Sequence, residues 1–340
     1  MDENIKAVSL SHLTPQMVKA ARDFVDLKFQ IDTEGRRYPG NIPDDLHGPA
    51  SGGEYGPYFG SDFFNNVIPF LPRRHALPPV EIMSVPVNHT LGCSWRLWPD
   101  PDILITEKEE VISYINSEHG IRDTYYIYIS ELGLFLPGEG KNRVNFCRYH
   151  NIKHIPACVR VGYYPDADTI KIYVLDIAGG RDVWAVLDNR FVQKVSHYAY
   201  ALPLLRAYGV KVLHEWPKVL PAMSDILHNA RYCSEDSDFH KTVIDISAVR
   251  DVLNKAVEKK VWGEEYVRCR LISFPLRKKY VYLAWVSVVW LVATIVLGSF
   301  REGLVGDIAL AVVAFTTGSL FVMMTSIFQV RKKHLEDYRR

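Results

Sequence analysis

The chain has 340 residues and a mass of 38.9 kDa, which is more than one typical domain and favours two folded units with appendages. Its 40 basic and 39 acidic side chains leave a net charge of +1, which excludes a protein-wide basic surface for nucleic acid. A hydrophobic content of 48% excludes a disordered chain. The five cysteines are scattered and odd in number, a pattern typical of reduced thiols rather than of a disulfide framework.

The N-terminal part, residues 1–79, is predicted to hold one helix followed by an irregular segment. Thr14 and Pro15 are typical of a helix start, and apolar residues then recur at helical spacing as far as about Phe29. Glycine and proline are frequent between residues 39 and 60, and aromatic residues interrupt them. This composition predicts an ordered irregular wrap rather than a free linker.

The middle of the chain alternates between strand and helix patterns. We expect a mixed domain over residues 80–190 and an α/β extension over residues 191–276. The predicted strands are residues 80–87, 125–129, 132–136, 155–164, 169–177, 183–187, 210–213 and 266–272. Helices are expected near residues 111–119, 144–150 and 199–208, and around Val249–Val257.

The C-terminal part, residues 277–340, contains two uncharged runs, residues 280–300 and 308–330. Runs of this length are typical of transmembrane helices, so we expect a two-span hairpin in a membrane. Basic residues flank the pair at 277–279 and 331–333, which predicts a multi-pass protein of the inner (cell) membrane with both termini in the cytoplasm.

The remaining residues 1–276 are mildly acidic. The tail from residue 277 onward holds nine basic and four acidic groups, which leaves about −4 on the preceding residues. Because neutralisation of phosphates supplies most nonspecific affinity for nucleic acid, this sign argues against nucleic acid as a partner.

The segment from residue 134 to residue 151 carries the strongest indication of chemistry. It predicts a strand, a turn containing Gly138 and Gly140, and a helix that starts near Asn142. The amides of a helix start attract anions, and Lys141 and Arg143 add positive charge there. The pattern is compatible with a phosphate or nucleotide pocket, but spacing alone favours the alternative, a simple chain reversal with solvated cations.

Two common nucleotide loops do not fit this segment. A Walker A loop needs Ser or Thr at the position of Asn142, and a dinucleotide-binding fingerprint needs Gly at the position of Arg143.

The same segment resembles the ParB/sulfiredoxin-like superfamily. The resemblance rests on the Gly-x-x-Arg box at Gly140–Arg143, on Ile155-Pro156 after it, and on the order of elements before it, and it covers about residues 80–165. It implies a ParB/sulfiredoxin-like mixed α/β (α+β) fold with elaborations, a bacterial source, and a nucleotide or phosphorylated ligand bound by five residues: Gly138, Gly140, Lys141, Asn142 and Arg143. Lys141 stands where sulfiredoxins have cysteine, so sulfinic-acid repair is not implied.

Two sets of candidate metal ligands lie near the box. Asp123, Glu131 and Glu139 could hold Mg²⁺ beside a bound nucleotide, and the alternative is that they are solvated loop carboxylates. A second set has zinc-type ligands, although the predicted elements point them in different directions, which favours ordinary thiols and imidazoles. Its members are Cys147, His150, His154 and Cys158.

We therefore expect a membrane-anchored cytoplasmic ParB-like domain that binds a nucleotide or phosphorylated ligand as a switch or as a phosphotransfer or hydrolysis enzyme. Whether it is an enzyme is left open. The alternative is a non-catalytic membrane scaffold or effector whose domain docks a protein partner. Ala314 and Gly318 form a small-xxx-small pair on the second run, which is compatible with a homo-oligomer.

Overall fold

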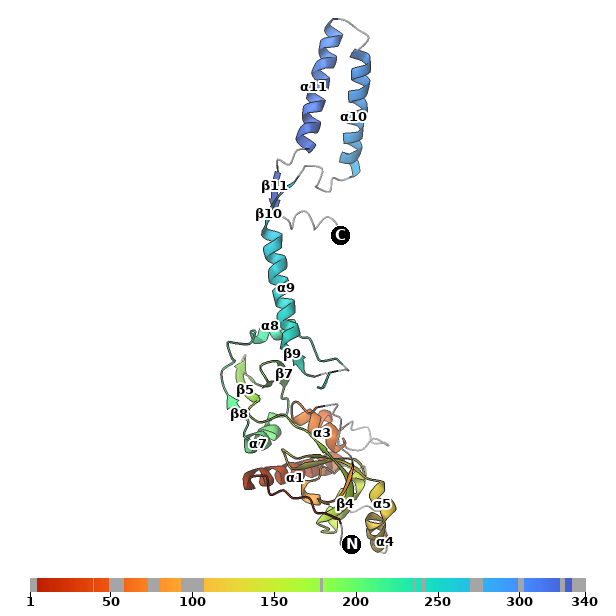
Figure 1. The fold of residues 1–340 in the computed structure, drawn as a ribbon, viewed down its shortest axis with the longest axis vertical. Coiled ribbons are helices and arrows are strands. Elements are labelled where there is room, and N and C mark those ends of the chain that lie inside the picture. Colours follow the sequence, from red (N-terminus) through yellow and green to blue (C-terminus); the bar gives the residue numbers. More distant parts are fainter. Residues whose placement is uncertain are drawn as a thin grey trace. The chain divides into compact units, whose positions relative to one another are not determined.

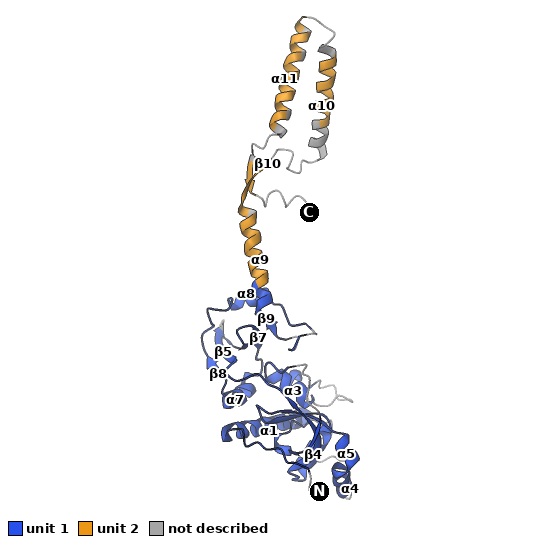
Figure 2. Cartoon of the chain, in the orientation of Figure 1, with its two compact units in different colours: residues 1–250 blue, residues 251–340 orange. Residues whose placement is uncertain are grey.

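The computed structural model describes residues 5–38, 40–48, 58–72, 80–92, 107–177, 180–234, 237–239, 242–269, 278–298, 303–324 and 328–331. The chain divides into two compact units, residues 1–250 and residues 251–340 (Figure 2). The described residues form both helices and sheets, which confirms the mixed α/β class. The expected boundaries after residues 79, 190 and 276 stay predictions.

The first sheet of the N-terminal unit has four strands in the order β1-β4-β2-β3 (Figure 1). β4 pairs antiparallel with β1 and parallel with β2, and β2 and β3 form an antiparallel hairpin. The strand bounds are Glu81–Pro86 for β1, Tyr125–Ile129 for β2, Leu134–Glu139 for β3 and His154–Gly162 for β4. A short 3-10 turn, η1 (Val87–His89), follows β1.

Helices cover both faces of this sheet because its strands alternate their apolar residues between two clusters. Tyr126 and Phe135 pack with Ile115 of helix α4 (Lys108–Asn116) and with Val144 of helix α6 (Lys141–Tyr149). On the other face, Ile129, Leu134 and Leu136 join a cluster with residues of α1 and α3. Helix α5 (Glu118–Arg122) follows α4 directly.

Helix α1 (Pro15–Arg37) forms the centre of the larger cluster. Its predicted start is confirmed, because the Thr14 hydroxyl accepts a hydrogen bond from the Met17 amide at 3.1 Å. The helix continues beyond Phe29, and Phe24 packs against Phe63 with ring centroids 5.4 Å apart. Two short helices follow α1, namely α2 (Asp44–His47) and α3 (Gly60–Val67). Much of the expected wrap, residues 39 and 49–57, lies outside the described residues.

The second sheet has five strands in the order β8-β5-β6-β7-β9 and shares the cluster around α1. Its bounds are β5 Ile170–Ile177, β6 Gly180–Leu187, β7 Phe191–Lys194, β8 Lys211–Leu213 and β9 Ile244–Asp245. Helix α7 (Tyr198–Tyr208) packs on α1, and α8 (Met223–His228) follows β8 in the chain.

The C-terminal unit consists of helices around one short β-ribbon. Helix α9 (Ile246–Glu264) leads into β10 (Tyr266–Cys269), which pairs antiparallel with β11 (Phe328–Arg331). Helices α10 (Lys278–Gly298) and α11 (Leu304–Met324) lie between the two strands in sequence and pack side by side (Figure 1).

The expected transmembrane hairpin is wrong. Among the described residues, none of the helices combines the length and the apolar character needed to cross a bilayer. The second uncharged run is not helical throughout: α11 ends at Met324, and Phe328–Arg331 is a strand.

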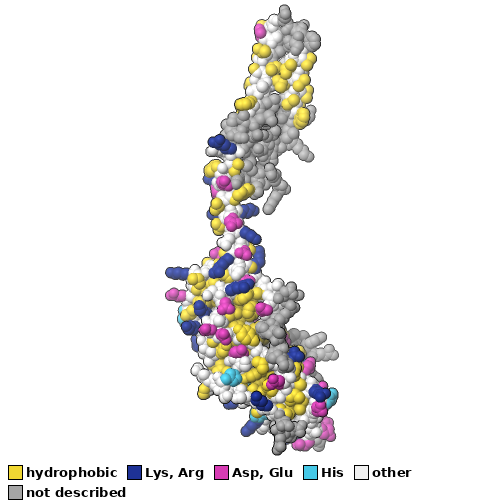
Figure 3. All heavy atoms as spheres, in the orientation of Figure 1, with side chains coloured by type: hydrophobic (Ala, Val, Ile, Leu, Met, Phe, Trp, Pro, Cys, Tyr) yellow, Lys and Arg dark blue, Asp and Glu magenta, His cyan; other side chains and the backbone are white. Residues whose placement is uncertain are grey.

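This finding also overturns the expectations that depended on the hairpin. The expected spans 280–300 and 308–330, the integral membrane contact and the multi-pass inner-membrane location are not supported. The flanking residues Arg277, Lys332 and Lys333 lie outside the described residues. What α10 and α11 do show is a set of exposed large apolar side chains, including Trp285, Trp290 and Phe315 (Figure 3).

Candidate anion site at the start of α6

The turn between β3 and α6 depends on Gly140, which is the N-cap of the helix. Its φ of +80° lies in the left-handed region that L side chains rarely adopt. A Cβ there would also lie 2.9 Å from Cγ2 of Thr124. Tyr126 donates its hydroxyl proton to the Gly140 carbonyl at 3.2 Å, which fixes the turn from the neighbouring strand. The sequence therefore needs glycine at this position.

A hollow of about 600 Å³ opens at this turn. Three cationic side chains, Arg122, Lys141 and Arg143, line it together with two carboxylates, Asp123 and Glu139. The remaining lining residues are Thr124, Tyr125, Gly140 and Asn142. Four of the five predicted site residues thus lie at one hollow. The fifth, Gly138, lies on β3 and directly precedes Glu139, which lines the hollow.

The start of α6, which lines this hollow, leaves two backbone amides without a partner in their own helix. The first amide bonded back to the turn is that of Arg143, which donates to the Gly140 carbonyl at 3.2 Å. The amides of Lys141 and Asn142 precede it, and such amides at a helix start have no carbonyl of their own helix to bond. They supply the positive end of the helix dipole.

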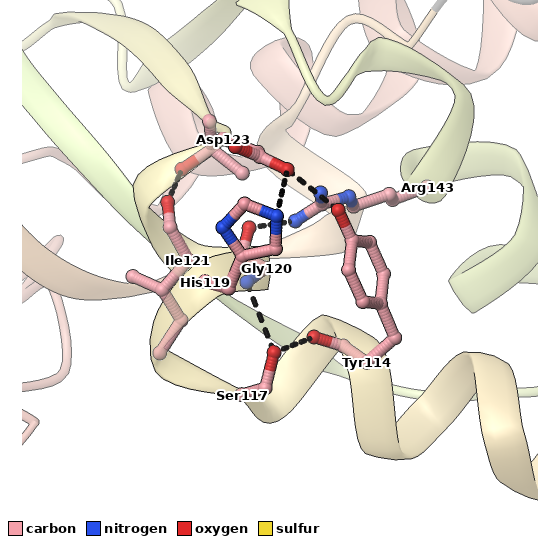
Figure 4. Close-up of polar contacts among 8 residues, drawn as sticks. Tyr114, Ser117, His119, Gly120, Ile121, Asp123 and Arg143 are labelled. Atoms are coloured by element: carbon pink, nitrogen blue, oxygen red, sulfur yellow. Dashed lines mark hydrogen bonds and ion pairs between the residues drawn. The ribbon is translucent and has the colours of Figure 1, made fainter.

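The guanidinium of Arg143 is held by one residue of α4 and one of α5 (Figure 4). Its Nη1 donates a hydrogen bond to the Gly120 carbonyl, and its Cζ lies 5.2 Å from the centroid of the Tyr114 ring. Both contacts fix the orientation of the positive charge beside Asp123. The prediction that Arg143 faces an open pocket thus needs refinement, because the same side chain also links two segments of the fold.

A small hydrogen-bond network shapes the junction of α4 and α5 (Figure 4). The Ser117 hydroxyl accepts from the Gly120 amide at 2.9 Å and donates to the Tyr114 carbonyl at 2.8 Å. A Cβ on Gly120 would lie 1.9 Å from the Tyr114 carbonyl oxygen, so glycine is required here as well. The network places the Gly120 carbonyl where Arg143 reaches it.

Asp123 is the acidic centre of the same network. Tyr114 donates its hydroxyl proton to Oδ2 of Asp123 at 2.5 Å, and Nε2 of His119 lies 3.8 Å from that oxygen. The hydrogen bond from Tyr114, with the charges of His119 and Arg143, holds the pKa of Asp123 below its usual value. This carboxylate therefore stays ionised at the edge of the hollow.

Lys141 is turned partly back onto its own turn. Its Nζ donates to the Gly138 carbonyl at 3.3 Å and lies 4.2 Å from the centroid of the Phe59 ring. Oε2 of Glu139 is 3.9 Å away, and 18% of the lysine side chain is exposed. Lys141 reaches an anion in the hollow only if this side chain rotates away from Gly138.

The three carboxylates expected to hold Mg²⁺ are not brought together. Asp123 and Glu139 line the hollow, but Glu131 lies in the turn at the other end of the β2–β3 hairpin, where Ser130 donates to it at 3.1 Å. No cluster of three His, Cys, Asp or Glu side chains suited to a metal ion exists in the part of the chain that the structure describes.

The four residues of the zinc-type set lie on different elements. Cys147 is buried on α6, and burial raises the pKa of its thiol to about 12. The His150 ring follows the helix and lies 4.6 Å from the Phe146 ring, whereas His154 is exposed at the start of β4. Cys158 is half-buried further along that strand.

Several residues at the hollow were missed from the sequence. Tyr114 and Gly120 were predicted only as parts of a helix and its end, and no role was predicted for Arg122 or Thr124. No spacing pattern in the sequence connects the segment from Tyr114 to Thr124 with the Gly-x-x-Arg box. The two are brought together only in the folded sheet.

No family model, curated protein or solved structure matches this chain. The resemblance to the ParB/sulfiredoxin-like superfamily consequently stays a prediction carried by residues 80–165 alone.

Proposed function

We propose that this protein binds a phosphorylated ligand of nucleotide size at the start of α6. The observation that carries the proposal is the hollow of about 600 Å³, which a helix start and three cationic side chains line. Ligand sites in proteins typically measure about 300–1,000 Å³. A helix start with nearby cations is a general solution for binding phosphate.

The chain's own residues would divide the work as follows. The amides of Lys141 and Asn142 donate to phosphate oxygens. Arg143 supplies a charge that the Gly120 carbonyl and the Tyr114 ring already orient, so little side-chain entropy is lost on binding. Arg122, paired with Glu118 at 2.6 Å, lies at the rim.

The two carboxylates of the hollow favour a ligand that arrives with a divalent cation. Asp123 and Glu139 would repel a bare phosphate but attract Mg²⁺ on a nucleotide, since hard cations prefer carboxylate oxygen. We therefore propose a magnesium–nucleotide complex as the ligand and a binding switch as the role. If the protein is an enzyme, the same site would carry out hydrolysis or phosphotransfer on this ligand.

The second candidate is a non-catalytic domain that docks a protein partner. One observation favours it: Arg143 and Lys141 both have partners within the chain, at Gly120 and Gly138, which suits a structural turn.

Calorimetry of the full chain against nucleoside mono-, di- and triphosphates, with and without Mg²⁺, separates these candidates. The decisive variant is Asn142→Asp, because an acidic residue in the first turn suits the helix dipole yet repels phosphate. We expect saturable binding that Asn142→Asp and Arg143→Gln each weaken by about tenfold or more. Arg206→Gln, at an exposed arginine of α7, is the matched control and should bind as the wild type does.

Absence of saturable binding across this panel would overturn the proposal and favour the docking domain. Equal affinity in wild type and Asn142→Asp would overturn the assigned location. Where binding is found, release of inorganic phosphate distinguishes an enzyme from a switch.

A further inference from the structure

A second hollow, of about 650 Å³, lies at the opposite end of α6. Its lining includes three cationic side chains from three parts of the chain: Arg22 of α1, Arg148 of α6, and Lys153 just before β4. No Asp or Glu is among its lining residues in the described part of the chain. This hollow thus differs in charge from the one at the start of α6.

The orientation of Arg22 is set by a buried histidine. His89 has no exposed surface, and its Nδ1 lies 2.8 Å from the Gly133 carbonyl. A carbonyl only accepts, so Nδ1 carries the proton and Nε2 is the acceptor for the Arg22 Nε–H at 3.2 Å. Because the acceptor is neutral, the arginine is held in place without loss of its charge. Burial and the charge of Arg22 lower the pKa of His89, which keeps the ring neutral.

The other cations differ in how far they are compensated. Arg148 is paired with Asp26, and its Cζ lies 4.6 Å from the centroid of the Phe29 ring. Among the described residues, no carboxylate is paired with Arg22 or Lys153. The hollow therefore holds an excess of positive charge.

These basic side chains are not needed to cap α6. The carbonyls of Phe146, Cys147 and Arg148 receive the amides of residues 150–152 at 2.8–3.2 Å. Asn151 makes this possible with a φ of 55°, a left-handed conformation common just after a helix. The helix end is thus closed by backbone alone, which leaves the cations available for another role.

The remaining walls are apolar. The segment before α1 runs beside β1, with the Val8 amide donating to the Ser84 carbonyl at 3.1 Å. This contact places Val8 and Leu10 in the lining, together with Ile152. A ligand here would therefore meet both positive charge and apolar surface.

We propose that this second hollow binds a small phosphate monoester, with the phosphate at Arg22 and Lys153 and its apolar part against Val8, Leu10 and Ile152. The proposal goes beyond the nucleotide site at the start of α6, because the two hollows share no lining residue.

Calorimetry of the full chain carrying Asn142→Asp tests this proposal without a contribution from the other site. The probes are phenyl phosphate and inorganic phosphate. We expect one site per chain that binds phenyl phosphate at least about fivefold more tightly than inorganic phosphate, since burial of the ring adds to the phosphate contact. Lys153→Gln should weaken phenyl phosphate binding by about tenfold.

Three results decide the outcome. Lys19→Gln, at an exposed lysine on the same helix as Arg22, is the matched control and should leave the affinity unchanged. Arg22→Gln should weaken binding at least as much as Lys153→Gln. Because Arg22→Gln also removes the hydrogen-bond partner of His89, the decisive variant is the one at the exposed Lys153. Equal affinities for Lys153→Gln and Lys19→Gln, or no saturable binding of phenyl phosphate, would overturn the proposal.

Discussion

Lys28 and Asp32 form an ion pair inside the core, one turn apart on α1 and shielded from solvent. Nζ of Lys28 lies 2.6 Å from Oδ2 of Asp32 and 5.4 Å from the centroid of the Phe63 ring. The two side chains expose 0% and 2% of their surface. Burial raises the pKa of Asp32 to about 6, against the opposing effect of Lys28. Each of the two buried charges is therefore stabilised by its partner.

Asp32→Leu should lower the free energy of unfolding by about 3–5 kcal/mol, because it leaves the lysine charge buried and unpaired. Replacing both residues, Lys28→Met with Asp32→Leu, should recover most of that loss. The matched control is Asp23→Asn, which breaks the Lys19–Asp23 pair at the same spacing on the exposed side of α1 and should cost less than about 1 kcal/mol. Urea unfolding of the three variants measures these differences, and a similar cost for Asp32→Leu and Asp23→Asn would contradict the expectation.

Gly140→Ala should destabilise the protein by about 1–2 kcal/mol from its left-handed φ alone, with an added cost from the contact with Thr124. Gly138→Ala is the comparison, since that glycine has an ordinary φ and its Cβ would meet only a flexible ring edge of Tyr125 at 3.0 Å. Thermal unfolding of both variants measures whether Gly140→Ala is the more destabilising substitution. If Gly138→Ala costs as much as Gly140→Ala, the left-handed turn is not what the site requires.

Stability should depend on pH through His89. Its pKa is lowered in the folded protein by burial, so below about pH 6.5 the unfolded chain binds a proton that the folded chain does not. The free energy of unfolding therefore falls as the pH drops through this window, by at most about 1.4 kcal/mol per pH unit for one group. Urea unfolding between pH 8 and pH 5 should show a smaller fall in His89→Gln than in the wild type. Parallel curves for the two proteins would assign the dependence to other groups.

Cys147 should resist thiol reagents in the native protein. Burial raises its pKa to about 12, so it has almost no reactive thiolate at neutral pH. Half-buried Cys158 is the internal comparison and should be alkylated first. Peptide mapping after brief alkylation with and without urea distinguishes the two, and native modification of Cys147 at the rate of Cys158 would show that the packing around α6 opens readily.

The sequence predicted those parts of the fold that local patterns determine. Thr14 and Pro15 marked the start of α1 because capping involves neighbouring residues. A short run of aromatic and β-branched residues located β2 at Tyr125–Ile129, and the turn before α6 was placed to within a residue or two. Gly140 was identified as a turn glycine, and the structure adds the reason for glycine there, its left-handed backbone.

Two kinds of error had physical causes. The uncharged run at residues 308–330 was read as one helix, but hydropathy does not report where a helix ends, and β11 begins at Phe328 because it pairs with β10. The partners of Arg143 were not predictable either, since Gly120 and Tyr114 belong to separate helices that only tertiary packing brings to α6.

Cys269 and Phe328 are paired at the end of the β10–β11 ribbon, so the segment between them is an insertion whose two ends lie side by side. Directly paired residues in antiparallel strands have Cα atoms only about 4.5–5.5 Å apart. A two-residue turn such as Asn-Gly could therefore join β10 to β11 in place of the whole insertion. The shortened chain would keep the ribbon and the Arg331–Glu264 ion pair at 2.5 Å, and any property lost with the deletion would belong to α10, α11 and the residues that connect them.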